Sequence, residues 1–218
     1  MLGIDPNLIP IVLLTIRVSG TALLLACLMG VPIGIIMAIG HFPGRRVLQV
    51  LISTGMGLPP VVVGLVVFIL FSNSGPLGAL EWLFTPNGMI TAQTILAFPL
   101  AAGLTSSAVA AVSPKLALQV RSMGATLWQE RWAIFFQARK GVLSAILAAF
   151  GRIIAEVGAV MLVGGNIEGR TRVLSTAIVL ETRQGNFGFA LSLGMILLGI
   201  ALVTNALTLH FGGGLSSD

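Results

Sequence analysis

Four long stretches without a charged side chain limit what this chain can fold into. They cover residues 18–40, 47–80, 82–114 and 184–217. A helix needs about 20 mostly apolar residues to cross the hydrocarbon core of a bilayer, so each stretch can hold one such helix. Charged residues make up only 9% of the chain, against about 25% in typical soluble domains. The sequence therefore predicts an all-α integral membrane protein.

A fifth apolar segment, 141–163, is interrupted only by Arg152 and Glu156. Glycine and proline are frequent within the apolar segments. Membrane helices tolerate them, because small residues allow close packing and neighbouring groups satisfy the freed backbone. We expect a single transmembrane domain over residues 1–218. Its five expected spans lie near 11–40, 47–71, 88–112, 141–163 and 187–209, with a loop at 113–140.

The basic residues predict the orientation of these spans, because cytoplasmic loops of membrane proteins carry an excess of Lys and Arg. The connections 41–46 and 113–140 together hold Arg45, Arg46, Lys115, Arg121, Arg131, Arg139 and Lys140. The connection 164–186 holds three basic residues that are partly offset by Glu168 and Glu181. Placing the two more basic connections inside puts the N-terminus outside and the C-terminus in the cytoplasm.

The sequence also excludes several kinds of chemistry. It contains no phosphate-binding GxxxxGK[ST] motif, no cluster of metal ligands and no catalytic triad. Its basic residues are scattered between apolar runs and form no face for nucleic acid. We therefore expect no enzyme activity, no metal and no cofactor in this chain. Energy for active transport would have to come from a partner or from an ion gradient.

The 113–140 connection carries an apolar stripe at helical spacing, formed by Leu116, Val120, Met123 and Leu127. Gly124 lies in the middle, where it can bend the chain or allow another backbone to approach closely. The pattern fits a membrane-surface helix between two spans. It equally fits a short cytoplasmic helix that docks in a groove on another protein.

The segment RSMGAT at 121–126 resembles the R-x-L-G-A-S core of the cytoplasmic coupling loop in permeases of binding-protein-dependent ABC importers. The two tryptophans that follow also fit that loop as it occurs in oxyanion permeases. The resemblance implies that a coupling segment, residues 121–128, docks on an ATPase. The implied contact residues are Arg121, Ser122, Met123, Gly124, Ala125, Thr126 and Trp128.

Residues 156–172 read EVGAVMLVGGNIEGRTR and look like molybdate and tungstate permeases, and TAIVLET at 176–182 looks most like the tungstate-type branch. The resemblance implies a homodimer in a bacterial or archaeal cytoplasmic (inner) membrane. Its implied partners are two ATPase subunits, which bind ATP and Mg inside, and an external substrate-binding protein. The implied substrate is a tetrahedral oxyanion, with tungstate as the first choice and molybdate or sulfate as alternatives.

Candidate residues for the anion path fall into three groups: Ser53 and Thr54; Thr105, Ser106 and Ser107; and Arg152 with Glu156. The hydroxyls can offer weak, transient hydrogen bonds to an anion, or they can bond carbonyls of their own helices. Arg152 and Glu156 are four residues apart and would share one helix face. They form either a neutralised structural pair or part of a gate.

The external connection offers Asn166, Arg170, Arg172 and Arg183 as candidates for docking the binding protein. Ion pairing with Glu168 and Glu181 within the connection is the alternative. Two other functions stay open at this point. Glu156 could carry protons in a secondary transporter, or the chain could be a membrane scaffold without transport activity.

The orientation can be tested by thiol labelling in a Cys27→Ser background, since Cys27 is the only native cysteine. A cysteine at Ser113 should be shielded from an impermeant reagent in intact cells, whereas a cysteine at Asn166 should react. Permeabilised cells provide the control, because both positions should then be labelled. The opposite pattern in intact cells would contradict the five-span orientation.

Overall fold

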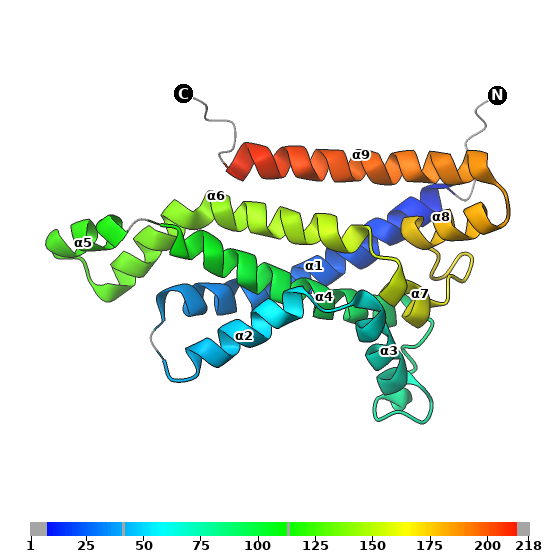
Figure 1. Cartoon of the computed structure of the whole chain (residues 1–218), viewed down its shortest axis with the longest axis horizontal. Helices are drawn as coiled ribbons and strands as arrows, with labels where there is room; N and C mark the ends of the chain where they lie inside the picture. The colour runs from blue at the N-terminus through cyan, green and yellow to red at the C-terminus, as the bar shows by residue number, and fades with distance from the viewer. Residues whose placement is uncertain (1–7, 41, 113, 213–218) are drawn as a thin grey trace.

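The computed structural model describes residues 8–40, 42–112 and 114–212. In these ranges all regular structure is helical, as predicted, and the longest helices run along the length of the molecule (Figure 1). The helices are α1 (Leu8–Ile39), α2 (Arg45–Met56), α3 (Pro60–Phe71), the 3-10 turn η1 (Gly78–Leu80), α4 (Pro86–Ala110), α5 (Pro114–Ser122), α6 (Leu127–Ile154), α7 (Gly158–Gly164), α8 (Leu174–Arg183) and α9 (Phe187–Gly212). The labelling position Ser113 lies outside the described residues, as do the two chain ends.

Four helices, α1, α4, α6 and α9, are each long and apolar enough to cross a membrane. The expected span over 47–71 is not one continuous helix, because α2 and α3 are bent by 100° at the break between them. The cause is local: Pro59 and Pro60 lack the N–H that would continue α2, and Pro59 is extended with φ −64° and ψ 122°. Within residues 8–40, 42–112 and 114–212, a fifth candidate span exists only if α2 and α3 together make one crossing.

The expected 113–140 loop is also replaced in part by helix, because α6 begins at Leu127, well before Gly141. Thr126 starts this helix with a capping box. Its side chain accepts from the backbone N–H of Gln129, and the Gln129 side chain accepts from the N–H of Thr126 at 2.8 Å. At its other end α6 stops at Ile154, and α7 follows after a short break instead of continuing the helix to residue 163.

The most extensive helix contact joins α1 to α4. Gly30 and Gly34 of α1 lie directly against α4, so that a Cβ atom on Gly34 would lie 2.8 Å from Cβ of Thr105 and closer still to the carbonyl oxygen of Ala102. Glycines one helical turn apart let two membrane helices approach to backbone contact. This contact holds the two central helices of the bundle together.

The short helix α7 is packed tightly against α3 and α4. Gly64 of α3 meets Cα of Ala159, and Gly164 of α7 meets the side chain of Met89 in α4. Ala159 and Val163 belong to the main buried cluster, which draws residues from α1, α3, α4 and α6 as well. Small residues therefore allow α7 to fit between two helices at one end of the molecule.

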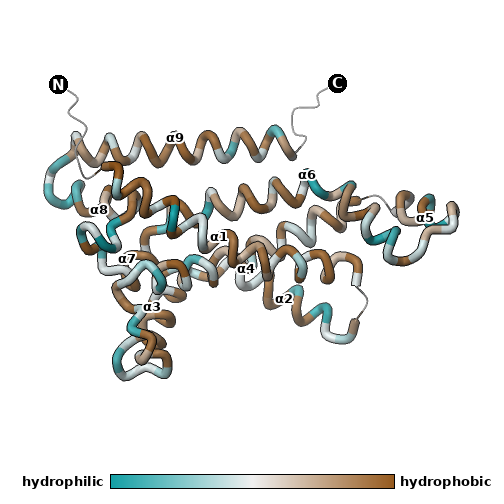
Figure 2. Tube along the Cα trace, turned by 180° about the vertical axis from the view of Figure 1, so that it is seen from behind, coloured by the Kyte–Doolittle hydropathy of each residue, from teal (hydrophilic) through white to brown (hydrophobic). Residues whose placement is uncertain are grey.

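Helix α9 covers the side of the bundle opposite α2, and both views show α6 lying between α9 and the α4–α2 side (Figures 1 and 2). Its residues are mostly hydrophobic (Figure 2). Leu191 and Met195 are 67% and 71% exposed. An apolar helix face of this kind is suited to contact with lipid acyl chains.

We predict that Gly34→Leu destabilises the bundle by about 1–3 kcal/mol or more, because the side chain has no space against α4. Gly20→Leu is the matched control on the same helix, since nothing lies within 4 Å of a Cβ atom there. Thermal unfolding of the detergent-purified protein measures both. Equal unfolding midpoints for the two variants would show that α1 and α4 leave room for a side chain at Gly34.

Candidate functional site

The two helix breaks face each other across a small cavity. Gly55 and Pro60 line it beside the α2–α3 break, Arg152 lines it from the end of α6, and Glu156 lines it from the α6–α7 break. Leu96 of α4 also lines it. Polar side chains therefore gather where two apolar segments have lost helical continuity.

Side chains from several elements satisfy the backbone at the α6–α7 break. The Gln93 side-chain amide of α4 donates to the carbonyl of Ile153 at 3.2 Å, and the hydroxyl of Ser175 in α8 donates to the carbonyl of Glu156 at 2.8 Å. The backbone N–H of Ala159 donates to Oε1 of Glu156 at 3.2 Å. Backbone groups without partners are costly in a membrane interior, so these contacts stabilise the interruption.

Arg152 and Glu156 form an ion pair, with 3.4 Å between Nη1 and Oε2. They do not share the face of one continuous helix, because α6 ends at Ile154. The Glu156 side chain is only 6% exposed and also accepts a hydrogen bond from the backbone N–H of Ala159 in α7, whereas the Arg152 side chain is 56% exposed. The carboxylate is thus buried and bonded on two sides, whereas the Arg152 side chain keeps a large exposed surface.

The candidate hydroxyl groups are not all brought together. Ser53 and Thr54 are exposed on α2, close to the residues of the α2–α3 break that line the cavity. Thr105 is fully buried, and its Cβ lies against Gly34 of α1, away from that surface. Ser106 is half-buried, and Ser107 donates to the carbonyl of Gly103 in its own helix at 3.1 Å. Ser53 and Thr54 come just before the cavity-lining Gly55 in the sequence but are not among the residues that line the cavity.

At the opposite end of α6, a bidentate ion pair ties α5 to α6. Arg121 donates from Nε to Oε2 of Glu130 at 2.6 Å and from Nη2 to Oε1 at 2.9 Å. These hydrogen bonds raise the pKa of Arg121 above its ordinary value. Ser122, the last residue of α5, donates to the carbonyl of Gln119 at 2.8 Å. Arg121 therefore helps to hold the turn between the two helices in place.

The apolar stripe expected over 116–127 is interrupted by this turn. Gly124 has φ +83°, a left-handed conformation that L side chains rarely adopt, so α5 cannot run on to Leu127. The N–H of Ala125 closes the turn on the carbonyl of Val120 at 3.2 Å. The turn nevertheless displays apolar side chains, since Met123 is 77% exposed and Trp128 is 66% exposed. The coupling segment is thus a compact bend with an exposed apolar surface.

The external docking candidates fall into two groups. Arg170 and Arg183 are exposed, whereas Arg172 is mostly buried and pairs with Glu168 at 3.5 Å. Glu181, which the sequence also offered as a pairing partner, instead accepts from the side-chain amide of Asn186 at 2.9 Å. Of the ion pairs expected within the connection 164–186, the structure therefore contains the one between Arg172 and Glu168.

The turn between α7 and α8 is built around Thr171. Its hydroxyl donates to the carbonyl of Gly164 at 2.6 Å and accepts from the N–H of Ile167 at 2.9 Å. Asn166 lies in this turn at φ +52°, after Gly165 at φ +71°. The GGN sequence therefore supplies left-handed backbone positions, and Asn166 contributes chiefly to the shape of the turn.

Sequence reasoning missed the residues that hold these arrangements together: Gln93, Glu130, Thr171 and Ser175. Gln93 had one detectable signal, because it is an amide side chain within an uncharged segment. The other three act through contacts with residues brought near by the fold. Glu130 pairs with Arg121 only because the chain reverses at Gly124.

Comparison with known proteins places these features in a family. A family model described as the binding-protein-dependent transport system inner membrane component matches residues 30–216. A probable anion ABC transporter permease protein of Haloferax volcanii is 44% identical over 94% of this chain and 90% of its own length. The tungstate uptake system permease protein TupB of Peptoclostridium acidaminophilum is 37% identical over 94% of this chain and 90% of its own length. The molybdenum transport system permease protein ModB of Escherichia coli K12 is 28% identical over 88% of each chain.

The fold matches solved structures as well. A crystal structure of an amino acid ABC transporter with histidines aligns with a TM-score of 0.72 at 20% identity, covering 96% of this chain and 94% of that one. The extent of the family match and the identity to the curated relatives lead to one conclusion. This chain belongs to the inner-membrane permease family of binding-protein-dependent ABC transport systems.

Proposed function

We propose that the chain is the permease subunit of an ATP-driven importer that carries tungstate into the cytoplasm. We choose tungstate because the chain is more similar in sequence to a tungstate uptake permease than to a molybdenum permease, over nearly its whole length. Molybdate and sulfate are the alternative substrates. ATP and Mg would bind to partner ATPase subunits, and the permease would couple their cycle to opening and closing of the path.

The exposed guanidinium of Arg152 supports a path between two copies of the chain. Charged side chains inside a membrane almost always face a bundle interior or a water-filled cavity. In the single chain, Arg152 is 56% exposed and lines the cavity beside the α2–α3 break, and the exposed Ser53 and Thr54 come just before that break in the sequence. A second copy facing this surface would enclose it. The resulting path would offer a mild positive potential and weak hydrogen bonds, which let an anion pass without being trapped.

The compact bend of the coupling segment supports its assignment to ATPase docking. Met123 and Leu127 present apolar surface, while the Arg121–Glu130 pair and the Thr126 cap hold the bend in one shape. A rigid bend can transmit movement between a docked ATPase and α6, because α6 continues from the bend to Arg152 at the other break. The same helix would thus link the energy source to the path.

The exposed Arg170 and Arg183 are our proposed contacts for an acidic face of the external binding protein. Arg172 and Asn166 instead support the turn that presents them, since Arg172 pairs with Glu168 and Asn166 adopts a left-handed conformation. Basic groups at such a surface steer an acidic partner and an anionic substrate. Discrimination between oxyanions would be made mainly by the binding protein.

The structural contacts of Glu156 argue against a proton-coupled mechanism. A proton carrier must exchange its proton during each cycle, but this carboxylate accepts the N–H of Ala159 and pairs with Arg152. Protonation would weaken both contacts, which hold the α6–α7 break. We therefore favour the ATP-driven mechanism.

Uptake by reconstituted vesicles tests this proposal. With the ATPase and the binding protein present, tungstate should accumulate only when ATP is hydrolysed, and faster than molybdate or sulfate. The double variant Arg170→Gln with Arg183→Gln should reduce tungstate and molybdate uptake by the same factor, because docking is lost while selectivity is not. Uptake driven by a proton gradient without ATP would contradict the mechanism, and sulfate as the preferred substrate would contradict the assignment of tungstate.

A second test concerns Gly124. Replacement by leucine should leave the permease in the membrane but reduce co-purification of the ATPase, since the bulky side chain would project from the bend towards the partner. Among the described residues, and apart from its two chain neighbours, no atom lies within 4 Å of a Cβ atom at this position. Gly124→Ala is the control for backbone strain, because it imposes a similar left-handed penalty, about 1–2 kcal/mol, with little bulk. If the leucine variant kept wild-type ATPase binding and transport, the docking role would be wrong.

A further inference from the structure

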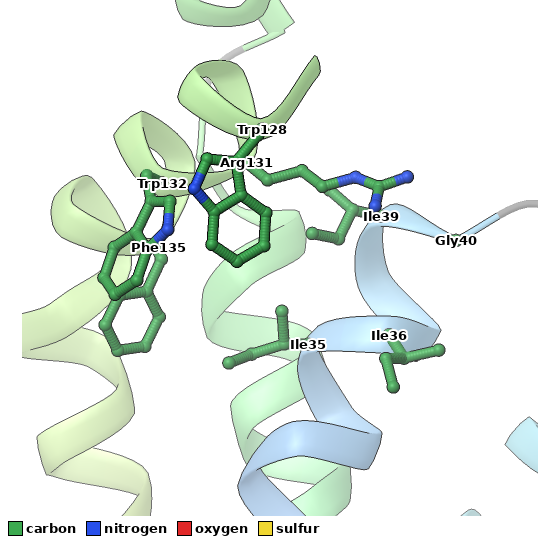
Figure 3. A pocket seen from close by; sticks show the side chains of 8 residues that line it. All are labelled: Ile35, Ile36, Ile39, Gly40, Trp128, Arg131, Trp132 and Phe135. Carbon is green, nitrogen blue, oxygen red and sulfur yellow. The ribbon is translucent and has the colours of Figure 1, made fainter. Parts of the chain in front are cut away.

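A second cavity lies between α1 and α6, at the end of the bundle that carries the coupling segment. It has a volume of about 360 Å³, and its walls are almost entirely apolar. Ile35 and Ile36 line it from the last turns of α1, and Trp132 and Phe135 line it from the first turns of α6 (Figure 3). Both helices are long and apolar enough to span a membrane. The cavity therefore opens between two candidate membrane-spanning helices.

One charged side chain lines this apolar cavity. Figure 3 shows the Arg131 side chain reaching from α6 towards Ile39. Ile35 and Ile36 lie farther from the start of α6 than its guanidinium does. In the part of the chain that the structure describes, no carboxylate lies within ion-pair distance of Arg131. The neighbouring Glu130 is occupied by Arg121. Arg131 is thus a cation at the rim of an apolar cavity, available to an anionic group from outside the chain.

The tryptophans beside Arg131 indicate the depth of the cavity in the membrane. Trp128 and Trp132 pack edge to face with ring centroids 5.8 Å apart, and they are 66% and 45% exposed. Tryptophan is enriched at the level of the lipid headgroups, where an apolar ring meets a polar boundary. Arg45 lies at the same end of α1, where it donates to the carbonyl of Ala38 at 3.3 Å, and adds positive charge there.

We propose that this cavity binds an anionic membrane phospholipid. One acyl chain lies between the isoleucines of α1 and the aromatic rings of α6, and the phosphate lies at Arg131. The arrangement matches the two chemical halves of such a lipid, an apolar chain and a negative headgroup. By filling the space between the end of α1 and the start of α6, the lipid holds the coupling segment against the bundle. This site does not depend on which anion the permease carries.

Quenching of tryptophan fluorescence by brominated lipids tests the proposal. A Trp82→Phe background leaves Trp128 and Trp132 as the only tryptophans, and both adjoin the cavity. The full-length permease is placed in phosphatidylcholine vesicles containing increasing fractions of dibrominated phosphatidylglycerol or dibrominated phosphatidylcholine. Half-maximal quenching should need about fivefold less of the anionic lipid than of the neutral one.

Three variants separate a built site from general surface attraction. Arg131→Gln should abolish the preference for phosphatidylglycerol, and Arg131→Lys should retain it. Arg139→Gln removes the same charge from the same helix, but Arg139 lies over the ring of Phe136 at 5.2 Å and does not line the cavity. It should therefore keep the wild-type preference. Size-exclusion elution in detergent checks that each variant is folded.

Other results would overturn the proposal. Equal quenching by the two lipids, or equal loss of preference in Arg131→Gln and Arg139→Gln, would make this an ordinary lipid-facing surface. Relief of quenching by dissolved phosphate or tungstate would assign Arg131 to a free anion. Displacement of the brominated lipid by the ATPase would assign the cavity to protein docking.

Discussion

The arrangement of this permease depends on how backbone groups are satisfied where helices are broken inside an apolar bundle. Water cannot serve these groups in a membrane interior, so other parts of the chain must do so. At the α6–α7 break, Gln93 and Ser175 donate to the carbonyls of Ile153 and Glu156, and the Glu156 carboxylate accepts the N–H of Ala159. These three contacts tie α4, α6, α7 and α8 together.

Close contacts between small residues place the two breaks next to each other. Gly64 brings α3 against Ala159 of α7, and Gly55 brings α2 against Pro99 of α4. A larger side chain at either glycine would separate the segments and open the cavity between Arg152 and the α2–α3 break. Glycine therefore serves mainly for close approach in this part of the molecule, whereas at Gly124 it serves for a left-handed turn.

Helix α6 connects the two regions to which we assign function. Its first turn is fixed by the Thr126 cap and the Arg121–Glu130 pair, and its last turn presents Arg152 to the cavity. A movement imposed at one end can be carried along a continuous helix to the other. The proposed lipid site beside Trp132 would act on the same helix near its start, and would limit how far that end can move from α1.

The long uncharged segments were sufficient to predict an all-α membrane protein, because the hydrocarbon core requires long uncharged helices. The sequence motifs also indicated the permease family correctly. Tertiary structure decided which polar groups meet. Arg172 pairs with Glu168 while Arg170 stays exposed, Thr105 packs against α1 while Ser53 remains open, and Glu156 caps α7 rather than extending α6. Hydropathy records the average environment of a segment, but the direction of each side chain depends on helix breaks and on contacts between residues far apart in the sequence.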